Sequence, residues 1–243
     1  MTGAFLNALG ILIGGLFGLA LRQPLSLRVQ LFFRSLLGLF TIFFGLRLAW
    51  LSINSPVLSA LKQIFIALLA MMIGKLLGKW LGLQRISNQL GRYAGNILSS
   101  APPPGMAAGF SACTVLFCVA PLGLIGAVAD GLSGYCYLLA VKAIMDGLAT
   151  SGSIKALGWP ATLSAFPVFL VLGTITVACR LYAVPFLTSH TSRGDDLVNA
   201  ISIVIGFISC GVALVIFQVR KVELANYLPG FAVAPLLAWL FGH

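Results

Sequence analysis

The sequence predicts an all-α membrane protein, a polytopic bundle of about eight transmembrane helices. Hydrophobic residues make up 60% of the 243 residues and charged residues only 8%, and the mean hydropathy is +1.06. A soluble domain usually carries about 25% charged residues. A surface so poor in charge would not keep the protein monomeric in water, so lipid is the expected solvent for most of the chain.

Eight apolar stretches are long enough to be considered as membrane spans, which need about 20 mostly apolar residues. They cover residues 3–21, 35–51, 57–81, 106–129, 134–150, 160–187, 197–219 and 224–241. The fifth is short and contains charged residues, and the eighth contains Pro229 and Pro235. These two spans are therefore the least regular of the eight.

The net charge of +10 reflects basic residues at the ends of the apolar stretches, where they orient a membrane protein. No Lys or Arg precedes the first stretch, so it is expected to be a permanent helix and not a signal peptide. With the N-terminus outside, the inner connections contain Arg22, Arg28, Arg34, Lys75, Lys79, Arg85, Arg92, Lys155, Arg220 and Lys221. This excess predicts that both termini lie outside, and it explains the net charge without nucleic acid.

Residues 83–98 differ from the spans because their apolar residues recur every three or four positions. Ile86, Leu90, Tyr93 and Ile97 form one face, and polar residues fill the other. This pattern predicts an amphipathic helix on the inner membrane surface. The Pro-rich stretch SSAPPPG ends it. We therefore expect one transmembrane domain over residues 1–243, with a three-span unit (1–82), an interfacial helix and spacer (83–104) and a five-span unit (105–243).

Two segments indicate an internal repeat. Residues 38–50 read GLFTIFFGLRLAW and residues 204–216 read VIGFISCGVALVI, and each precedes a turn and another span. If spans 1–3 correspond to spans 6–8, the repeat is inverted, which is a frequent transporter architecture. The alternative is that apolar segments resemble one another through composition alone.

Glycines spaced four residues apart occur in two of the spans. Small residues at this spacing line one helix face and let another backbone approach closely. This pattern is explained by helix packing, and it is also compatible with helices that slide or rock during transport. The two sets are Gly10, Gly14 and Gly18, and Gly74, Gly78 and Gly82.

Lys142 and Asp146 are charged residues within the fifth span. Lys142 lies about 12 Å from the outer end of that span, at 1.5 Å per helical residue, which is near the middle of a bilayer. The two residues are one helical turn apart and can pair. The pair either stabilises the bundle interior or forms part of a solute site, because charge within a bilayer is costly and usually paired or functional.

Other polar residues are weaker candidates. Asn7 lies within the first span and either holds helices together or binds a ligand. Asp130 falls at the outer end of the fourth span, where a solvated turn would also explain it. Asn226 opens the eighth span. Together with Lys142 and Asp146, these residues form the predicted substrate site.

The sequence lacks patterns for catalysis, metal binding or a cofactor. It has no Gly-x-Ser-x-Gly and no phosphate-binding Gly-x-x-x-x-Gly-Lys. Its histidines, His190 and His243, lie far apart, and its five cysteines contain no Cys-x-x-Cys pair. We therefore expect no enzyme, no bound metal and no cofactor.

The run FSACTVLFCVAPLGLIGAVADGLSGYCYLLAVKAIMDGLAT, residues 110–150, resembles the YdfK/YqgA-like family of uncharacterised bacterial membrane proteins (domain of unknown function 554). The similarity lies in LFC-x-x-x-P, in IG followed by DGL, and in K-x-x-x-DG. The chain departs from that pattern at Ala120, where a glycine is usual, and at Leu172, where a glutamine is usual. The resemblance implies a membrane protein and emphasises Asp130, Lys142 and Asp146, but it implies no substrate.

These observations predict a small-solute transporter or channel in a bacterial inner membrane. A membrane scaffold or accessory subunit without transport activity is the alternative, and a membrane enzyme ranks third because catalytic groups are missing. The expected partners are membrane lipid and a small solute. Assembly of the chain into a homo-oligomer is compatible with the sequence.

Overall fold

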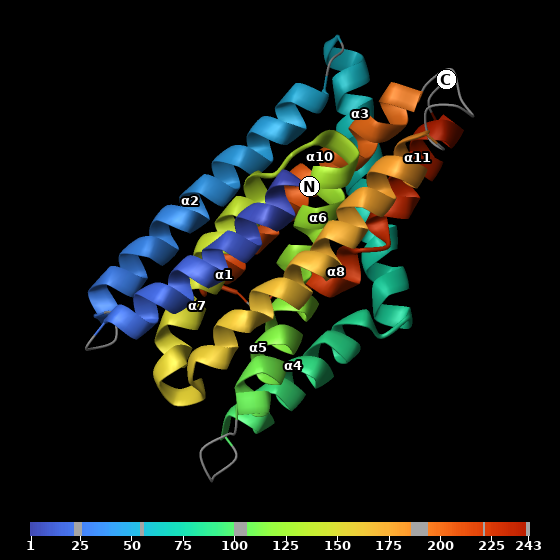
Figure 1. Ribbon diagram of the computed structural model, residues 1–243. Helices are drawn as coiled ribbons and strands as arrows, with labels where there is room; N and C mark the ends of the chain where they lie inside the picture. Colours follow the sequence, from blue (N-terminus) through green and yellow to red (C-terminus); the bar gives the residue numbers. More distant parts are fainter. Residues whose placement is uncertain (22–25, 54–55, 100–105, 186–193, 221, 242–243) are drawn as a thin grey trace. The chain divides into compact units, whose positions relative to one another are not determined.

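The computed structural model describes residues 1–21, 26–53, 56–99, 106–185, 194–220 and 222–241, and every regular element in these ranges is helical (Figure 1). The elements η1 and η3 are 3-10 helices and η2 is a π-helix. In chain order the elements are α1 (Thr2–Ala20), α2 (Leu27–Ser52), α3 (Val57–Trp80), α4 (Leu83–Ser99), α5 (Met106–Val119), α6 (Pro121–Ser133), α7 (Tyr137–Leu157), η1 (Trp159–Ser164), α8 (Ala165–Ala178), η2 (Cys179–Ala183), α10 (Gly194–Ile216), η3 (Leu224–Tyr227) and α11 (Gly230–Phe241).

The helices confirm the predicted all-α bundle of about eight spans. Within the described ranges, six helical segments are long and apolar enough to cross a membrane: 2–20, 28–52, 57–80, 159–183, 195–216 and 224–241. The helices α5 and α6 meet the same criteria as a pair that is bent by 56°, and they count as a seventh span if the pair is one broken span. The fifth predicted span is α7, a helix of 21 residues. It contains the charged residues Lys142 and Asp146 within its apolar sequence. The inverted repeat stays a prediction.

The contacts group the chain into two compact units, and each unit draws on distant parts of the sequence. Unit 1 comprises residues 1–33, 85–130 and 136–177, and so contains α1, α5, α7 and η1 together with most of α4, α6 and α8. Unit 2 comprises residues 34–84, 131–135 and 178–243, and so contains most of α2 together with α3, α10, η3 and α11. The two units are described separately.

In unit 1, α1 packs along α7 (Figure 1), and η1 packs against α1, α5 and α7. Glycines make the α1–α7 contact very close. A Cβ atom added at Gly147 would lie 2.6 Å from the Gly10 carbonyl oxygen, and one added at Gly14 would overlap the Gly147 backbone. The buried core around this contact includes Ile11, Leu139 and Val168.

The end of α7 depends on a conformation that suits glycine. Gly158 has a φ of +76°, a left-handed value that glycine adopts without the steric cost other residues incur. The backbone N–H of Gly158 donates to the Ile154 carbonyl. Pro160 then falls in the first turn of η1, where a missing N–H costs no hydrogen bond. This turn places η1 beside α1 and leads into α8.

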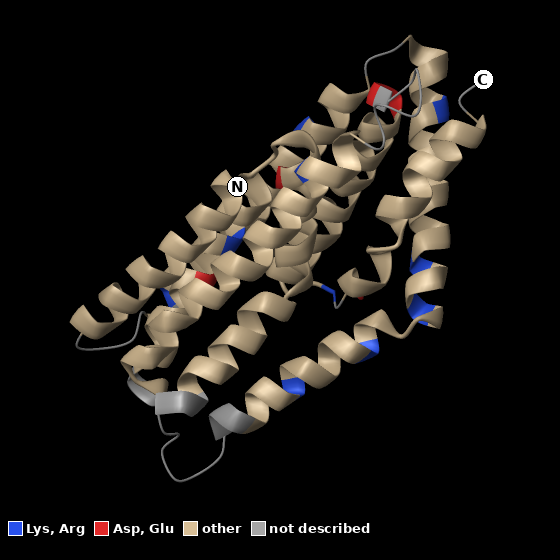
Figure 2. Cartoon of the chain, turned by 45° about the vertical axis from the view of Figure 1, so that its right-hand side comes forward, with Lys and Arg blue, Asp and Glu red and all other residues tan. Residues whose placement is uncertain are grey.

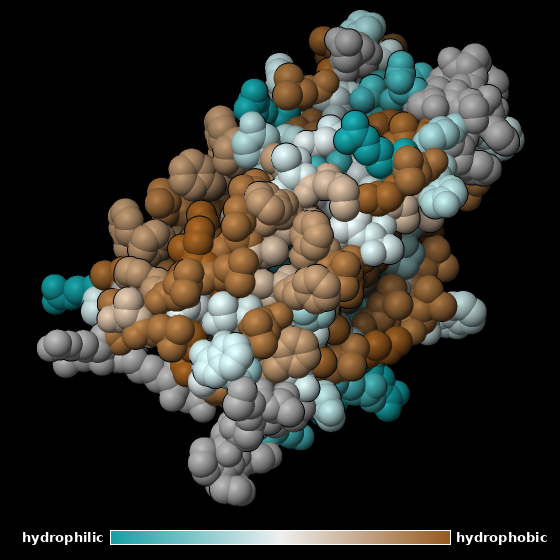
Figure 3. Space-filling view, viewed as in Figure 1, coloured by the Kyte–Doolittle hydropathy of each residue, from teal (hydrophilic) through white to brown (hydrophobic). Residues whose placement is uncertain are grey.

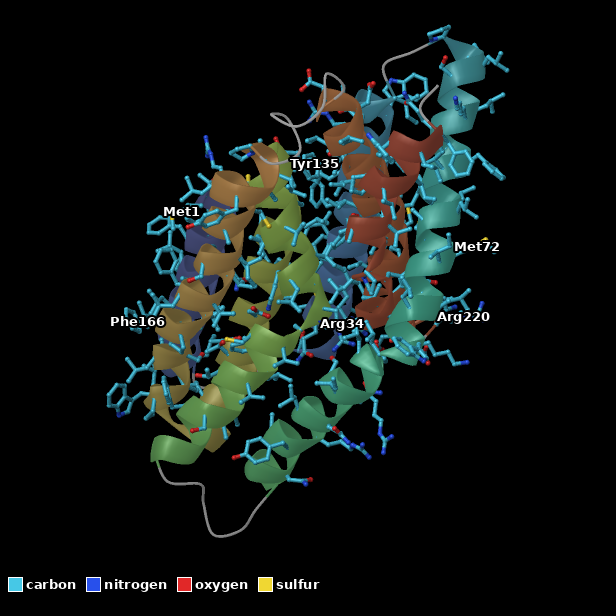
Figure 4. All side chains as sticks on the ribbon, turned by 90° about the vertical axis from the view of Figure 1, so that its right-hand side faces the viewer. Met1, Arg34, Met72, Tyr135, Phe166 and Arg220 are labelled. Carbon is cyan, nitrogen blue, oxygen red and sulfur yellow. The ribbon has the colours of Figure 1, made fainter. Side chains whose placement is uncertain are left out.

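In unit 2, α3 packs against η3 and α11, and α10 packs against α3 and α11. A Cβ atom at Gly74 would lie 2.5 Å from the Gly230 nitrogen, and one at Gly78 would overlap the Asn226 backbone. The Tyr135 hydroxyl, labelled in Figure 4, donates to the Phe44 carbonyl. Both units therefore join helices through glycines at which no side chain would fit.

Large apolar side chains lie on the outside of the helices. Trp80 is 84% exposed, Leu58 82% and Trp50 78%. Phe166 is also exposed and points away from the ribbon in Figure 4, and brown, hydrophobic side chains are abundant in Figure 3. Contiguous apolar surface of this extent marks contact with lipid or protein, as expected of a membrane protein.

The amphipathic helix predicted over residues 83–98 is present as α4. On its apolar face, Ile86 and Tyr93 are exposed, whereas Ala94 is buried. Arg85 and Arg92 are also exposed, and Figure 2 shows basic positions along this helix. The side chain of Ile97 lies outside the described residues. The location of α4 at the membrane surface stays a prediction.

Two glycines of α7 allow a matched test of the α1–α7 contact. We predict that Gly147→Ala lowers the melting temperature in detergent by several degrees, because overpacking typically costs about 1–3 kcal/mol. Gly152→Ala is the control, since nothing lies within 4 Å of a Cβ atom added there. It should be neutral or stabilising by about 0.5–1 kcal/mol. Equal melting temperatures for the two variants would contradict the close contact.

Candidate functional site

The helix α7 places a lysine and an aspartate together in the interior of unit 1. The Lys142 ammonium donates to Oδ2 of Asp146, one turn further along the helix. The two side chains are only 2% and 11% exposed. An ion pair at this spacing is favoured by helix geometry alone, but its burial is set by the packing of α1, α5 and α6 around α7.

The surroundings of Lys142 are mainly apolar. Its Nζ lies 5.7 Å from the centroid of the Phe117 ring, a distance at which a cation is attracted to the ring face. A Cβ atom added at Gly123 would lie 2.7 Å from Lys142 Cε and 3.3 Å from Leu172 Cδ2. The lysine stem therefore occupies the space that Gly123 leaves open, beside α8.

The bend between α5 and α6 lies close to this lysine. Ala120 belongs to neither helix, and Pro121 opens α6 without an N–H to continue the hydrogen bonds of α5. The last carbonyl groups of a helix lack intrahelical partners and form its negative end. Phe117 is in the last turn of α5, so the ring that the Lys142 ammonium approaches belongs to the end of α5 at this break.

Asn7 of α1 is the third polar residue of the site. Its side chain is fully buried, and its amide lies near the Asp146 carboxylate. Among the described residues, however, neither amide atom makes a hydrogen bond of ordinary geometry. Most buried polar groups in proteins are hydrogen-bonded. The Asn7 amide thus has a donor and an acceptor that a further small molecule can use.

Asp130 is buried and not in a solvated turn. Its Oδ2 accepts from the Gly3 backbone N–H at 3.0 Å and lies 3.1 Å from the N-terminal ammonium of Met1. A carboxylate in this place stabilises the N-terminus of α1 by satisfying an unpaired N–H and the helix dipole. Asp130 therefore fixes the start of α1, one turn before Asn7.

Asn226 belongs to unit 2, and its amide is already used there. Its Oδ1 accepts from the Gln84 backbone N–H at 3.0 Å, and its Nδ2 donates to Glu223 at 2.8 Å. Gln84 in turn accepts from the Ala225 backbone at 3.1 Å. These bonds tie the start of α4 to η3.

Of the residues predicted for the site, the structure thus brings together Lys142, Asp146 and Asn7. Sequence reasoning did not include Phe117 or Gly123 in the site. The available signal was Pro121, a proline in the middle of an apolar stretch, which marks a break in the span. Cys113 and Cys118 of α5 also lie within electrostatic range of Asp146.

Within the described ranges, no group of three or more His, Cys, Asp or Glu side chains is placed to hold a metal ion.

The helices, their exposed apolar surface and the buried ion pair define a polytopic α-helical membrane protein. The chain belongs to the family described as "Protein of unknown function (DUF554)", which matches residues 2–239. This confirms the resemblance found in the sequence.

Two relatives match along nearly their whole length. "Uncharacterized protein YqgA" of Escherichia coli (strain K12) is 27% identical over 243 residues, covering 98% of this chain and 97% of the relative. "Uncharacterized membrane protein YdfK" of Bacillus subtilis (strain 168) is 24% identical over 241 residues, covering 99% of this chain and 96% of the relative. No solved structure matches the chain.

The ion pair predicts a characteristic order of stability among variants. Lys142→Met leaves a buried carboxylate unpaired and should destabilise the protein by about 3–5 kcal/mol. The double variant Lys142→Met with Asp146→Leu removes both charges and should be close to the wild type. Thermal unfolding in detergent measures the stability of both variants. Lys79→Met is the control, because Lys79 is an exposed residue of α3. A double variant less stable than the single one would contradict the pairing.

Proposed function

We propose that this protein is a small-solute transporter or channel in a bacterial inner membrane. The observation that carries the proposal is the buried Lys142–Asp146 pair, which lies beside the hydrogen-bonding groups of Asn7. Charges within a bilayer-spanning bundle are costly and mark solute or ion pathways. An apolar pair of similar volume often serves stability equally well. The retention of charge therefore supports a task beyond folding.

The bend between α5 and α6 supports the same proposal. Transporters commonly bind solutes near the middle of the membrane, at discontinuous helices whose ends present unpaired backbone groups. Non-helical backbone at membrane depth is tolerated where it is buried in protein or lines a cavity. Here the break at Ala120 lies within one turn of Phe117 and Gly123, which lie beside the lysine side chain.

A membrane scaffold or accessory subunit is the second candidate, and the near-complete burial of Lys142 favours it. A dry, packed interior serves a scaffold, whereas a transporter needs a second conformation that opens the site to water. The glycine contact between α1 and α7 supports such a movement. Two backbones in direct contact can slide without disengaging large side chains, and α1 carries Asn7 with it.

The transport proposal predicts a solute that depends on the ion pair. An unbiased screen for small molecules that raise the melting temperature should yield compounds active on the wild type. The same compounds should not stabilise the double variant Lys142→Met with Asp146→Leu, although that variant is folded. Compounds that stabilise both proteins equally would rule out a site at this pair and would favour the scaffold.

The proposed orientation, with both termini outside, predicts the accessibility of two connections. A single cysteine introduced at Ser153 should react only with reagents that reach the cytoplasm. One at Ser192, which lies outside the described residues, should react from the outer side. Membrane-impermeant maleimide applied to intact and to opened cells distinguishes the two sides. Labelling of both positions from one side would show that a span between them is absent.

A further inference from the structure

We infer that the solute is a small carboxylate anion, bound together with one proton that Asp146 accepts. This inference rests on the proposed function and specifies the chemistry of the same site. It draws on the net charge of the buried groups, on the unused hydrogen-bonding groups of Asn7 and on the close packing around Lys142.

Charge balance restricts what the site can take. Lys142 and Asp146 together are neutral, and both side chains are nearly inaccessible to water. A bare anion would leave the apolar interior with one uncompensated negative charge, and a bare cation with a positive one. Each isolated buried charge is strongly disfavoured. An anion that arrives with one proton keeps the cluster neutral.

The three polar groups complement a carboxyl group. The Lys142 ammonium has three N–H donors, one of which Asp146 uses. Asn7 contributes one unused amide group with a donor and an acceptor. A carboxylate can accept hydrogen bonds from the Lys142 ammonium and from Asn7 Nδ2, while Oδ1 of Asn7 can accept a hydrogen bond from the protonated Asp146. The bound state then satisfies the groups that the protein alone leaves unsatisfied.

The step conserves charge and atoms. Asp146 takes up a proton from the buffered solution, and its salt bridge to Lys142 breaks. Lys142 forms a new salt bridge with the incoming carboxylate, and on release the anion and the proton leave together. The groups that face Asp146 are Lys142 on α7, Asn7 on α1, and the thiols of Cys113 and Cys118 on α5. Thr150 donates to the backbone carbonyl of Asp146 and not to its carboxylate.

The close packing around the pair favours a solute of few heavy atoms, because the surrounding helices must move to admit it. Lys142 is 1% exposed and Asn7 is not exposed, and a single added methyl group at Gly123 would already collide with the lysine stem. A zwitterion such as glycine would also keep the cluster neutral. Its ammonium would need several acceptors beside Asp146, however, and Asn7 offers one. The geometry therefore favours the anion with a proton.

The test is calorimetric titration of acetate and of formate into the purified full chain. Titrations at one pH in two buffers of different ionisation enthalpy give the number of protons taken up. We expect about one proton per anion, and an affinity that weakens as the pH rises, by at most about tenfold per pH unit, as linkage of one proton requires. Binding without proton uptake, or no binding of either anion, would overturn the inference.

Two variants separate the role of Asp146 from a general effect. Asp146→Asn imitates the protonated carboxyl, so it should bind acetate without proton uptake and with an affinity independent of pH. Asp195→Asn is the control, because Asp195 is an exposed carboxylate at the start of α10, outside unit 1. It should keep the proton uptake and pH dependence of the wild type. If Asp146→Asn does not fold, the number of protons that the wild type takes up per anion tests the inference without it.

Glycine is titrated in parallel to keep this inference distinct from the proposed function. Binding of glycine without proton uptake, in place of acetate and formate, would overturn the proton-coupled anion and leave the transport proposal standing. The transport proposal is tested separately by the screen with the double variant. That screen does not depend on the identity of the solute, and compounds that stabilise both proteins equally would contradict the proposal.

Discussion

The low dielectric around the Lys142–Asp146 pair is the constraint on which the rest of unit 1 depends. A charged pair of this kind survives in an apolar interior only when both partners are held in contact and shielded from lipid. The shield consists of α1 in close backbone contact with α7, of α5 with the Phe117 ring, and of α6, whose Gly123 leaves room for the lysine stem. Asp130 then fixes the start of α1, so that Asn7 remains beside the pair.

Much of the fold could be predicted because it follows from local composition and periodicity. Apolar length predicts the spans, and the spacing of Ile86, Leu90 and Tyr93 predicts α4. The pairing of Lys142 with Asp146 also follows from one helical turn. The bend at Ala120 was not predicted, although Pro121 marks it, because an apolar stretch of normal length conceals a break.

The grouping of polar residues could not be predicted, since it depends on contacts between distant parts of the chain. Asp130 lies near a span end, which is compatible with a solvated turn, but the N-terminus of α1 comes to it across 127 positions of sequence. Asn226 looks like Asn7 in sequence, a lone amide near the start of an apolar stretch. Only tertiary packing shows that Gln84 and Glu223 engage it. Hydropathy carries no information about either partner.

The contrast between these two asparagines is the strongest argument that unit 1 contains more than a structural ion pair. Both side chains are buried, and both lie beside glycine-mediated helix contacts. In unit 2 the amide of Asn226 is satisfied at both ends, as expected of a residue that holds helices together. The Asp146 carboxylate of α7 lies beside Asn7, yet among the described residues the Asn7 amide makes no hydrogen bond of ordinary geometry. A rearrangement of the Lys142–Asp146 pair would bring the amide and the carboxyl group into hydrogen-bonding geometry. A solute that separates Lys142 from Asp146 produces such a rearrangement.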